Sequence, residues 1–352
     1  MATISFSFLN SLSPHRIIKK NDASSWGLVV KDLAKINTST SVGVIRTTFL
    51  KPKMMLNKLE TYPYTVPGLG LGGVLKDEFV FQQKFHIRSY EVGPDKKITA
   101  ETLMSLLQET ALNHLKTIGV WVDGLGLTRE MCNKKLIWVA AKQEVVVDRY
   151  PIWGDVIQIN TWKGAYGKIG MCSNWAFYDD KTGDILLRAS SILVMMNEET
   201  RRLSKFPDEV RGELNRHFTY TTPPTVKEET RKWSTRDRST EDHIRTGLTP
   251  TWSDLDMNQH VNNMKYAGWI IESVPRSIVK NYELASMTLE YSRECRMGDV
   301  LQSRTYVMGI DTCKLADYDH VDCEHVIQLE STSDEIMKAW TTWRSKKGNR
   351  LE

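Results

Sequence analysis

Three polar residues that alternate along the second half of the chain, Asp256, Asn258 and His260, are the residues best suited to chemistry. In an extended backbone alternate side chains share one face, so these three are expected to point together. An imidazole with an ordinary pKa of about 6.5 can move a proton near neutrality, and an amide can donate a hydrogen bond to a developing negative charge. The set therefore fits attack on an acyl thioester carbonyl, in which Asp256 can orient the histidine, activate water or attack the carbonyl itself. The interleaved apolar residues are expected to face the core: Leu255, Met257 and Val261.

Two further candidates, Glu294 and Cys295, follow each other in a stretch that is expected to be a strand. We expect Glu294 to lie across a pocket from His260 and to act as a general base for water. Cys295 offers a rival chemistry, a Cys–His–Asn nucleophile, although most strand cysteines are simply small buried side chains. A purely structural alternative also stays open, because an Asp-x-Asn-x-His run can serve only as a turn and a helix cap.

The elements that must position these residues follow the same order twice: a strand, a helix, then several strands. In the first half, Phe79–Glu91 alternates as a strand does, and Thr99 can cap a helix from Glu101 to Ile118. In the second half, a short strand is expected over Thr249–Ser253 and a helix over 263–272. The remaining expected strands cover residues 136–149, 155–167, 170–180, 185–197, 285–295, 299–310, 325–333 and 336–345.

Matching landmarks indicate an internal duplication. Gly154–Val156 recurs as Gly298–Val300, and Arg188–Ser191 recurs in order and spacing as Lys338–Thr341. A helix wrapped by one antiparallel sheet, made twice, places the chain in the α+β class. The first-half counterpart of the reactive run, Ser89–Lys97, has neither His nor Asn. The second half is therefore expected to react and the first half to shape the pocket.

Charge is unevenly distributed along the 352 residues, whose net charge is +4. Residues 1–55 hold eight Lys/Arg, two acids and thirteen Ser/Thr, a composition typical of an organellar transit peptide. The other 297 residues carry 39 basic and 41 acidic side chains, so nucleic-acid binding through bulk charge is not expected. Five cysteines without CxxC spacing favour neither a disulfide framework nor a zinc ribbon, and no apolar run is long enough for a membrane span.

From about Phe79 to Arg344 the sequence resembles the plant acyl-acyl carrier protein thioesterases, and within them the B class, which favours saturated chains. The resemblance rests on these segments: RSYEVG, ETLMSLLQETALNH, CNKKLIWV, VVVDRYPIWGDV, TRRLSKFPDEVR, WSDLDMNQHVNNMKYAGWIIES and ELASMTLEYSREC. It implies two tandem hot-dog folds, a location in the chloroplast stroma, and release of free fatty acid from acyl carrier protein, which ends chain elongation. It implies no metal or organic cofactor.

Carried over residue by residue, the family's catalytic positions fall on Asp256, Asn258, His260 and Glu294, with Cys295 at a position once taken for a nucleophile. Acyl carrier protein is acidic, so a basic docking patch is expected. Its candidate residues are Arg201, Arg202, Lys205 and Arg211. Two alternatives remain: a hot-dog dehydratase that acts on hydroxyacyl thioesters, and an acyl-binding protein that has lost its activity. A homodimer is left open.

Two departures from the family pattern limit what the resemblance carries over. The segment LKPKMMLNKLETYPYTVPGLGLGG lacks the apolar stretch that B-class members usually have before the catalytic body, and Met171–Trp175 stands where a basic pair and an aspartate commonly precede the Trp. The preferred chain length is therefore not transferred. The expected organisation is a transit peptide over 1–55, a disordered lead-in over 56–77, hot-dog units over 78–215 and 246–346, a linker over 216–245, and a tail over 347–352.

Overall fold

The computed structural model describes residues 72–75, 79–167, 170–218, 242–308 and 318–346. These residues belong to one compact unit that spans Pro63–Glu352. The expected transit peptide and tail, and most of the expected lead-in and linker, lie outside the described residues.

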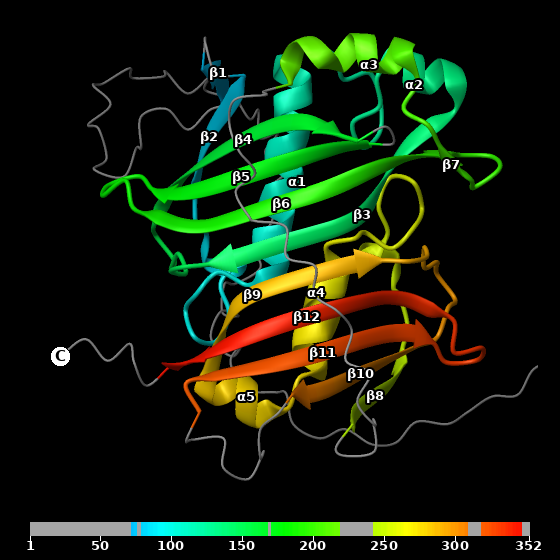
Figure 1. Cartoon of the computed structure of the whole chain (residues 1–352). Helices are drawn as coiled ribbons and strands as arrows, with labels where there is room; N and C mark the ends of the chain where they lie inside the picture. Colours follow the sequence, from blue (N-terminus) through cyan, green and yellow to red (C-terminus); the bar gives the residue numbers. More distant parts are fainter. Residues whose placement is uncertain (1–71, 76–78, 168–169, 219–241, 309–317, 347–352) are drawn as a thin grey trace, which may run out of the picture. The chain divides into compact units, whose positions relative to one another are not determined.

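A twelve-stranded antiparallel sheet forms the body of the described chain (Figure 1). Its strand order is β1-β2-β4-β5-β6-β3-β9-β12-β11-β10-β8, with β7 paired to β6. The strands are β1 (Gly73–Leu75), β2 (Val80–His86), β3 (Leu136–Val147), β4 (Val156–Tyr166), β5 (Gly170–Asp179), β6 (Ile185–Asn197), β7 (Leu203–Ser204), β8 (Asp242–Leu248), β9 (Tyr282–Tyr291), β10 (Leu301–Met308), β11 (His320–Leu329) and β12 (Glu335–Ser345).

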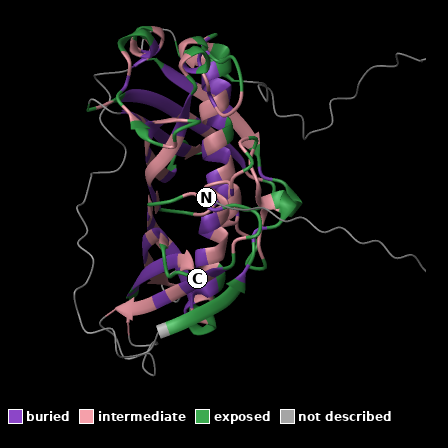
Figure 2. Ribbon diagram, turned by 90° about the vertical axis from the view of Figure 1, so that its right-hand side faces the viewer, coloured by how far each residue is buried: buried purple, intermediate pink, exposed green. Residues whose placement is uncertain are grey.

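The helices lie on one face of this sheet, as the side view shows (Figure 2). They are α1 (Ala100–Thr117), α2 (Arg129–Lys134), α3 (Asp208–Leu214), α4 (Lys265–Ser273) and α5 (Arg276–Asn281), with 3-10 turns at Ser89–Glu91, Asn215–His217 and Trp252–Asp254. Burying one face against helices is the usual way for an antiparallel sheet to form a core.

The predicted duplication is present in the order of the strands. The first-half order β2-β4-β5-β6-β3 is repeated by β8-β10-β11-β12-β9, and the halves join where β3 pairs with β9. Each half places one central helix, α1 or α4, against its strands (Figure 1). The first turns of these helices meet, because Glu101 of α1 forms an ion pair with Lys265 of α4. One cluster of buried apolar residues includes members of α1, α4 and strands of both halves, and a second cluster lies around Leu115, Trp138 and Met171.

The helix expected from Glu101 to Ile118 is confirmed within one residue at each end. Thr99 is its N-cap, with a side-chain oxygen that accepts the Thr102 N–H at 3.1 Å, so one free donor of the first turn is satisfied. The second helix begins two residues later than expected, at Lys265.

The expected strands at the entrance to each helix are partly wrong. Thr249–Ser253 is not a strand; β8 ends at Leu248, and Trp252–Asp254 is a 3-10 turn. The cause is local, because Asp254 accepts the Thr251 N–H at 2.8 Å and so offers the backbone an alternative to a sheet partner. For the same reason β2 stops at His86, ahead of a turn in which Glu91 accepts the Arg88 N–H at 2.7 Å.

Candidate active site

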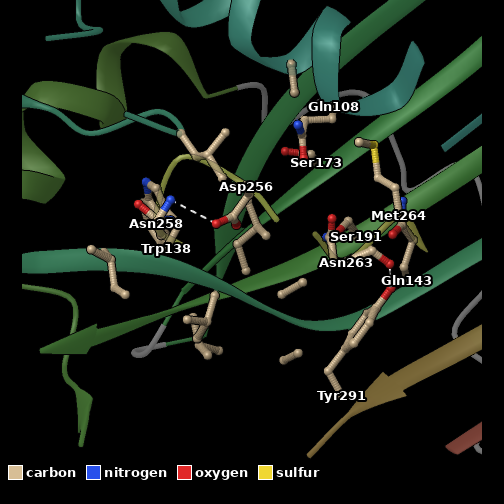
Figure 3. A pocket seen from close by; sticks show the side chains of 18 of the residues that line it. Gln108, Trp138, Gln143, Ser173, Ser191, Asp256, Asn258, Asn263, Met264 and Tyr291 are labelled. Carbon is tan, nitrogen blue, oxygen red and sulfur yellow. Dashed lines mark hydrogen bonds between the residues drawn. The ribbon is translucent and has the colours of Figure 1, made fainter. Parts of the chain in front are cut away.

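The residues of the Asp-x-Asn-x-His run project from one tight turn that precedes α4. The Asp256 N–H donates to the His260 carbonyl at 2.8 Å, and the Gln259 N–H donates to the Asp256 carbonyl at 3.0 Å. Gln259 closes the turn with φ +60°, in the left-handed region that few non-glycine residues adopt. One carboxylate oxygen of Asp256, Oδ1, accepts the N–H groups of Asn258 at 2.8 Å and His260 at 3.2 Å. These hydrogen bonds hold all three residues in a fixed relation. Figure 3 shows the hydrogen bond between Asp256 and Asn258.

The expected strict alternation of faces is wrong at one residue. Val261 is buried and Leu255 packs against the core, but Met257 is 65% exposed. Alternation requires an extended backbone, and the turn at Gln259 interrupts it.

Glu294 lies against this turn, although not on a strand as expected, because β9 ends at Tyr291. Its Oε2 is 3.3 Å from Nε2 of His260, and its Oε1 forms an ion pair with Arg201. The segment is joined to the turn by the Val261 N–H, which donates to the Cys295 carbonyl at 3.0 Å. The structure thus brings together all four residues predicted to be catalytic.

Arg201 is the part of the site that sequence reasoning placed elsewhere, among the carrier-docking residues. It lies in the turn after β6 at φ +55°, and its guanidinium points to Glu294. Burial lowers the pKa of His260, and the positive charge of Arg201 lowers it further. Burial also lowers the pKa of Arg201, with Arg296 as a second cause. Both causes favour the neutral form of the imidazole.

Cys295 does not have the surroundings of a nucleophile. Its side chain is fully buried within the apolar core, and burial is the main cause that raises the pKa of its thiol to about 12. A thiolate is the reactive form of cysteine, and such a pKa leaves almost none of it at neutral pH.

A cavity of about 390 Å³ connects the four residues with the interior of the first half. The cavity is lined by α1, by strands β3, β4, β5 and β6, and by Asp256, Asn258, His260 and Glu294. Figure 3 shows Asp256 and Asn258 among the lining residues. Its apolar wall includes Leu107, Leu115, Trp138, Met171 and Leu193. An acyl chain can be enclosed here while its thioester lies at the polar residues.

The equivalent turn of the first half has the same backbone and different side chains. The Gly93 N–H donates to the Lys97 carbonyl at 2.8 Å, the Lys96 N–H donates to the Gly93 carbonyl at 2.9 Å, and Lys96 has φ +65°. Gly93, Asp95 and Lys97 therefore stand where the second half has Asp256, Asn258 and His260. Of these two turns, only the second-half turn carries the combination of Asp, Asn and His.

The remaining basic residues expected to dock a carrier protein are only partly available. Arg202 and Lys205 are exposed. The guanidinium of Arg211 lies 4.4 Å from the centre of the Phe206 ring, and that side chain is half-buried.

Over the described ranges no three His, Cys, Asp or Glu residues are grouped so that they could hold a metal ion. Within the same part of the chain no helix is long and apolar enough to cross a membrane.

Comparison with known proteins agrees with this geometry. Residues 78–214 match the acyl-ACP thioesterase N-terminal domain, and residues 237–345 match the C-terminal domain. The chain is 49% identical over 312 residues to the palmitoyl-acyl carrier protein thioesterase, chloroplastic, of Arabidopsis thaliana, which covers 88% of this chain and 75% of the relative. It is 47% identical over 312 residues to the hydrolase FATB2, chloroplastic, of Cuphea viscosissima, with coverage of 88% and 74%.

Solved structures show the same fold. The 12:0-ACP thioesterase from Umbellularia californica superposes with a TM-score of 0.70 at 45% identity, over 76% of this chain and 95% of that one. A thioesterase structure from Lactobacillus plantarum at 20% identity, with a TM-score of 0.62 over 77% and 98%, supports the fold alone. The chain therefore belongs to the acyl-ACP thioesterases as a FATB-type member, and is a thioester hydrolase with a double hot-dog fold.

Proposed function

We propose that the chain releases free fatty acid from acyl carrier protein in the plastid, with the second half (246–346) supplying the chemistry and the first half (78–215) enclosing the acyl chain. The relatives compared above are named chloroplastic, and the composition of residues 1–55 fits a transit peptide. Free acid in place of a carrier-bound chain terminates elongation.

Asn258 and the turn that carries it polarise the thioester. Attack by water places negative charge on the carbonyl oxygen, and a donor aimed there in advance stabilises it. The Asn258 side chain lines the cavity, and Asp256 fixes its position by accepting its backbone N–H at 2.8 Å. Asp256 thus orients the site through one oxygen.

Glu294 and His260 handle the proton. Glu294 accepts a proton from water as the water oxygen bonds to the acyl carbon, the carbon–sulfur bond breaks, and the proton returns through His260 to the departing thiolate. A neutral His260 is required, because an imidazolium would form a charged pair with Glu294 and weaken it as a base. Burial and Arg201 lower the pKa of His260 and so favour the neutral ring.

The observation that carries this proposal is the contact of 3.3 Å between His260 and Glu294 at the wall of a cavity that Asp256 and Asn258 also line. If the turn served only to cap α4, no contact between His260 and Glu294 would be needed.

The test is hydrolysis of acyl carriers of graded chain length by the purified protein, with free thiol and free acid both measured. His260→Ala and Glu294→Gln are each expected to lower kcat by at least about a hundredfold. Unchanged thermal melting of the variants separates loss of chemistry from loss of folding. Formation of an enoyl thioester without thiol release would instead indicate a dehydratase, and binding with no turnover would indicate an acyl-binding protein.

Arg202 and Lys205 are proposed to contact the acidic carrier. They are exposed and lie close in sequence to Arg201, whose guanidinium is at the active site. Opposite charges at an exposed contact mainly raise the association rate and act most strongly at low salt.

A further inference from the structure

A row of four polar side chains crosses the sheet beneath α1. Lys163 of β4 pairs with Ser173 of β5, and Ser173 pairs with Ser191 of β6. Ser191 in turn pairs with Gln143 of β3. Directly opposite residues of antiparallel strands share a face, and all four line the cavity that reaches Asp256. Figure 3 shows three of them, Ser173, Ser191 and Gln143. At about 4.8 Å per strand this polar row extends over roughly 14 Å.

The polar row is deeply buried and incompletely hydrogen-bonded. Lys163 is 1% exposed, and within the described residues its ammonium forms one hydrogen bond, to Ser173 Oγ at 3.4 Å. The side chains of His114 and Cys172 also lie near enough to interact with its charge. Among the described residues no carboxylate lies within ion-pair distance of Lys163, although an ammonium carries three N–H donors. Gln143 is 5% exposed, and its side-chain oxygen has no hydrogen-bond partner within the described ranges. Buried groups left in this condition are costly, so a ligand that completes them binds well.

The fold itself does not require a polar row here. The second half repeats the same strands, and its equivalent row consists of Val307, Cys323, Thr341 and Met287, joined by the same direct pairings. A lysine stands in the first half where a valine stands in the second.

The neighbouring positions of the same face are mainly apolar. On one side of the polar row lie Trp175, Ala189 and Val145 in register, and on the other lie Met171 and Leu193. A plain hydrocarbon chain would pack well on these rows but would leave Lys163 without any further hydrogen bond.

We propose that this thioesterase selects acyl groups that carry a hydroxyl or oxo oxygen on the distal part of the chain, and that Lys163 is the residue that selects them. This inference rests on the proposed function, since it names the acyl group bound in the same cavity. The oxygen accepts a hydrogen bond from the Lys163 ammonium. Ser173, Ser191 and Gln143 supply further donors and acceptors along the path from the reacting carbon. The selectivity arises because the analogue without oxygen leaves the buried ammonium unpaired.

The experiment compares kcat/KM for ω-hydroxyacyl, ω-oxoacyl and unsubstituted acyl carriers of equal length, over a series of lengths. The wild-type protein is expected to prefer an oxygenated chain by about ten- to a hundredfold at the length that reaches Lys163. Lys163→Met should reverse this preference, and Lys163→Gln should retain part of it. Lys142→Met is the matched control, because Lys142 is the next residue to Gln143 but pairs with Glu144; its preference should equal that of the wild type.

Each outcome decides the matter. Hydrolysis of unsubstituted chains with equal or higher efficiency at every length would overturn the inference and leave the proposed function intact. Acceptance of longer plain chains by Lys163→Met, without any preference for oxygen in the wild type, would show that the lysine only limits length, and would also overturn it. Hydrolysis of none of the three carriers would contradict the proposed function instead. If the variants do not fold, the wild-type preference alone gives the answer.

Discussion

Replacing Arg201 with methionine tests the electrostatics of the site most directly. Methionine keeps much of the length of the side chain and removes its charge. Arg201 forms an ion pair with one oxygen of Glu294, and His260 lies 3.3 Å from the other. Two effects are therefore expected: Glu294 loses a contact that orients it, and His260 loses a positive charge that lowers its pKa.

The size of both effects follows from the geometry. Two cationic groups on opposite sides of one carboxylate are about 6 Å apart, and at an effective dielectric constant of about 40 their repulsion is ~1.4 kcal/mol. This repulsion disfavours the charged ring and so lowers the pKa of His260. In the proposed mechanism activity requires the neutral ring and rises with pH through this pKa, so removal of Arg201 raises the pKa and moves the acid limb to higher pH. Loss of orientation at Glu294 should lower kcat by about ten- to a hundredfold.

The assay is the dependence of kcat on pH for the wild type, Arg201→Met and Arg201→Lys. Arg201→Lys retains the charge and should keep the acid limb near its wild-type position. Lys134→Met, which removes an exposed lysine paired with Glu209 on the surface, is the control and should change neither quantity. An acid limb that does not move in Arg201→Met would refute the assignment of His260 as the group that must be neutral.

Three further outcomes are expected. Cys295→Ala should retain kcat within a few-fold, because the thiol is buried and its pKa is about 12. If the variant folds but its kcat falls by several orders of magnitude, the thiol is the nucleophile after all. The double variant Arg202→Glu, Lys205→Glu should raise KM at low salt for an acyl group on the carrier protein, but not for the same acyl group on pantetheine. Equal effects on KM for both substrates would show that these residues do not contact the carrier protein. Ile270→Ala, which empties a fully buried position of α4, should cost about 2–5 kcal/mol of stability and lower the melting temperature, and an unchanged melting curve would contradict the packing of α4.

The parts of the site that could be predicted are those that the chain encodes locally. Asp256, Asn258 and His260 lie within five residues, and their residue types together indicate acyl chemistry. The helix that begins at Ala100 was predictable for a similar reason, because a capping Thr99 precedes a periodic apolar stripe. The order of the elements was enough to choose Glu294 as the acid across the pocket, although β9, the strand expected to carry it, ends earlier, at Tyr291.

The parts that could not be predicted depend on tertiary contacts. Arg201 reaches Glu294 across 93 residues of sequence, and a basic residue in a turn otherwise indicates only a solvated surface. Arg201 could have been found by asking which basic residue supplies the positive charge that a half-buried carboxylate such as Glu294 needs. The polar row is equally hidden, because Lys163, Ser173, Ser191 and Gln143 meet only through the register of four strands.

The first half carries a charged network at the position equivalent to the proposed active site. Lys97, at the place of His260, forms an ion pair with Glu283, which also accepts a hydrogen bond from Arg344 at 2.7 Å. Glu283 and Arg344 are direct partners on β9 and β12, as Val139 and Val194 are on β3 and β6 at the wall of the cavity. Val139 and Val194 line the same cavity as the second-half turn, whereas Lys97 of the first-half turn completes the charged pair of Glu283 and Arg344. A hydrocarbon chain cannot displace such a network without leaving buried charges unpaired. The proposed division of labour between the halves is therefore supported by this exchange of valines for charges as well as by the absence of a histidine from the first-half turn.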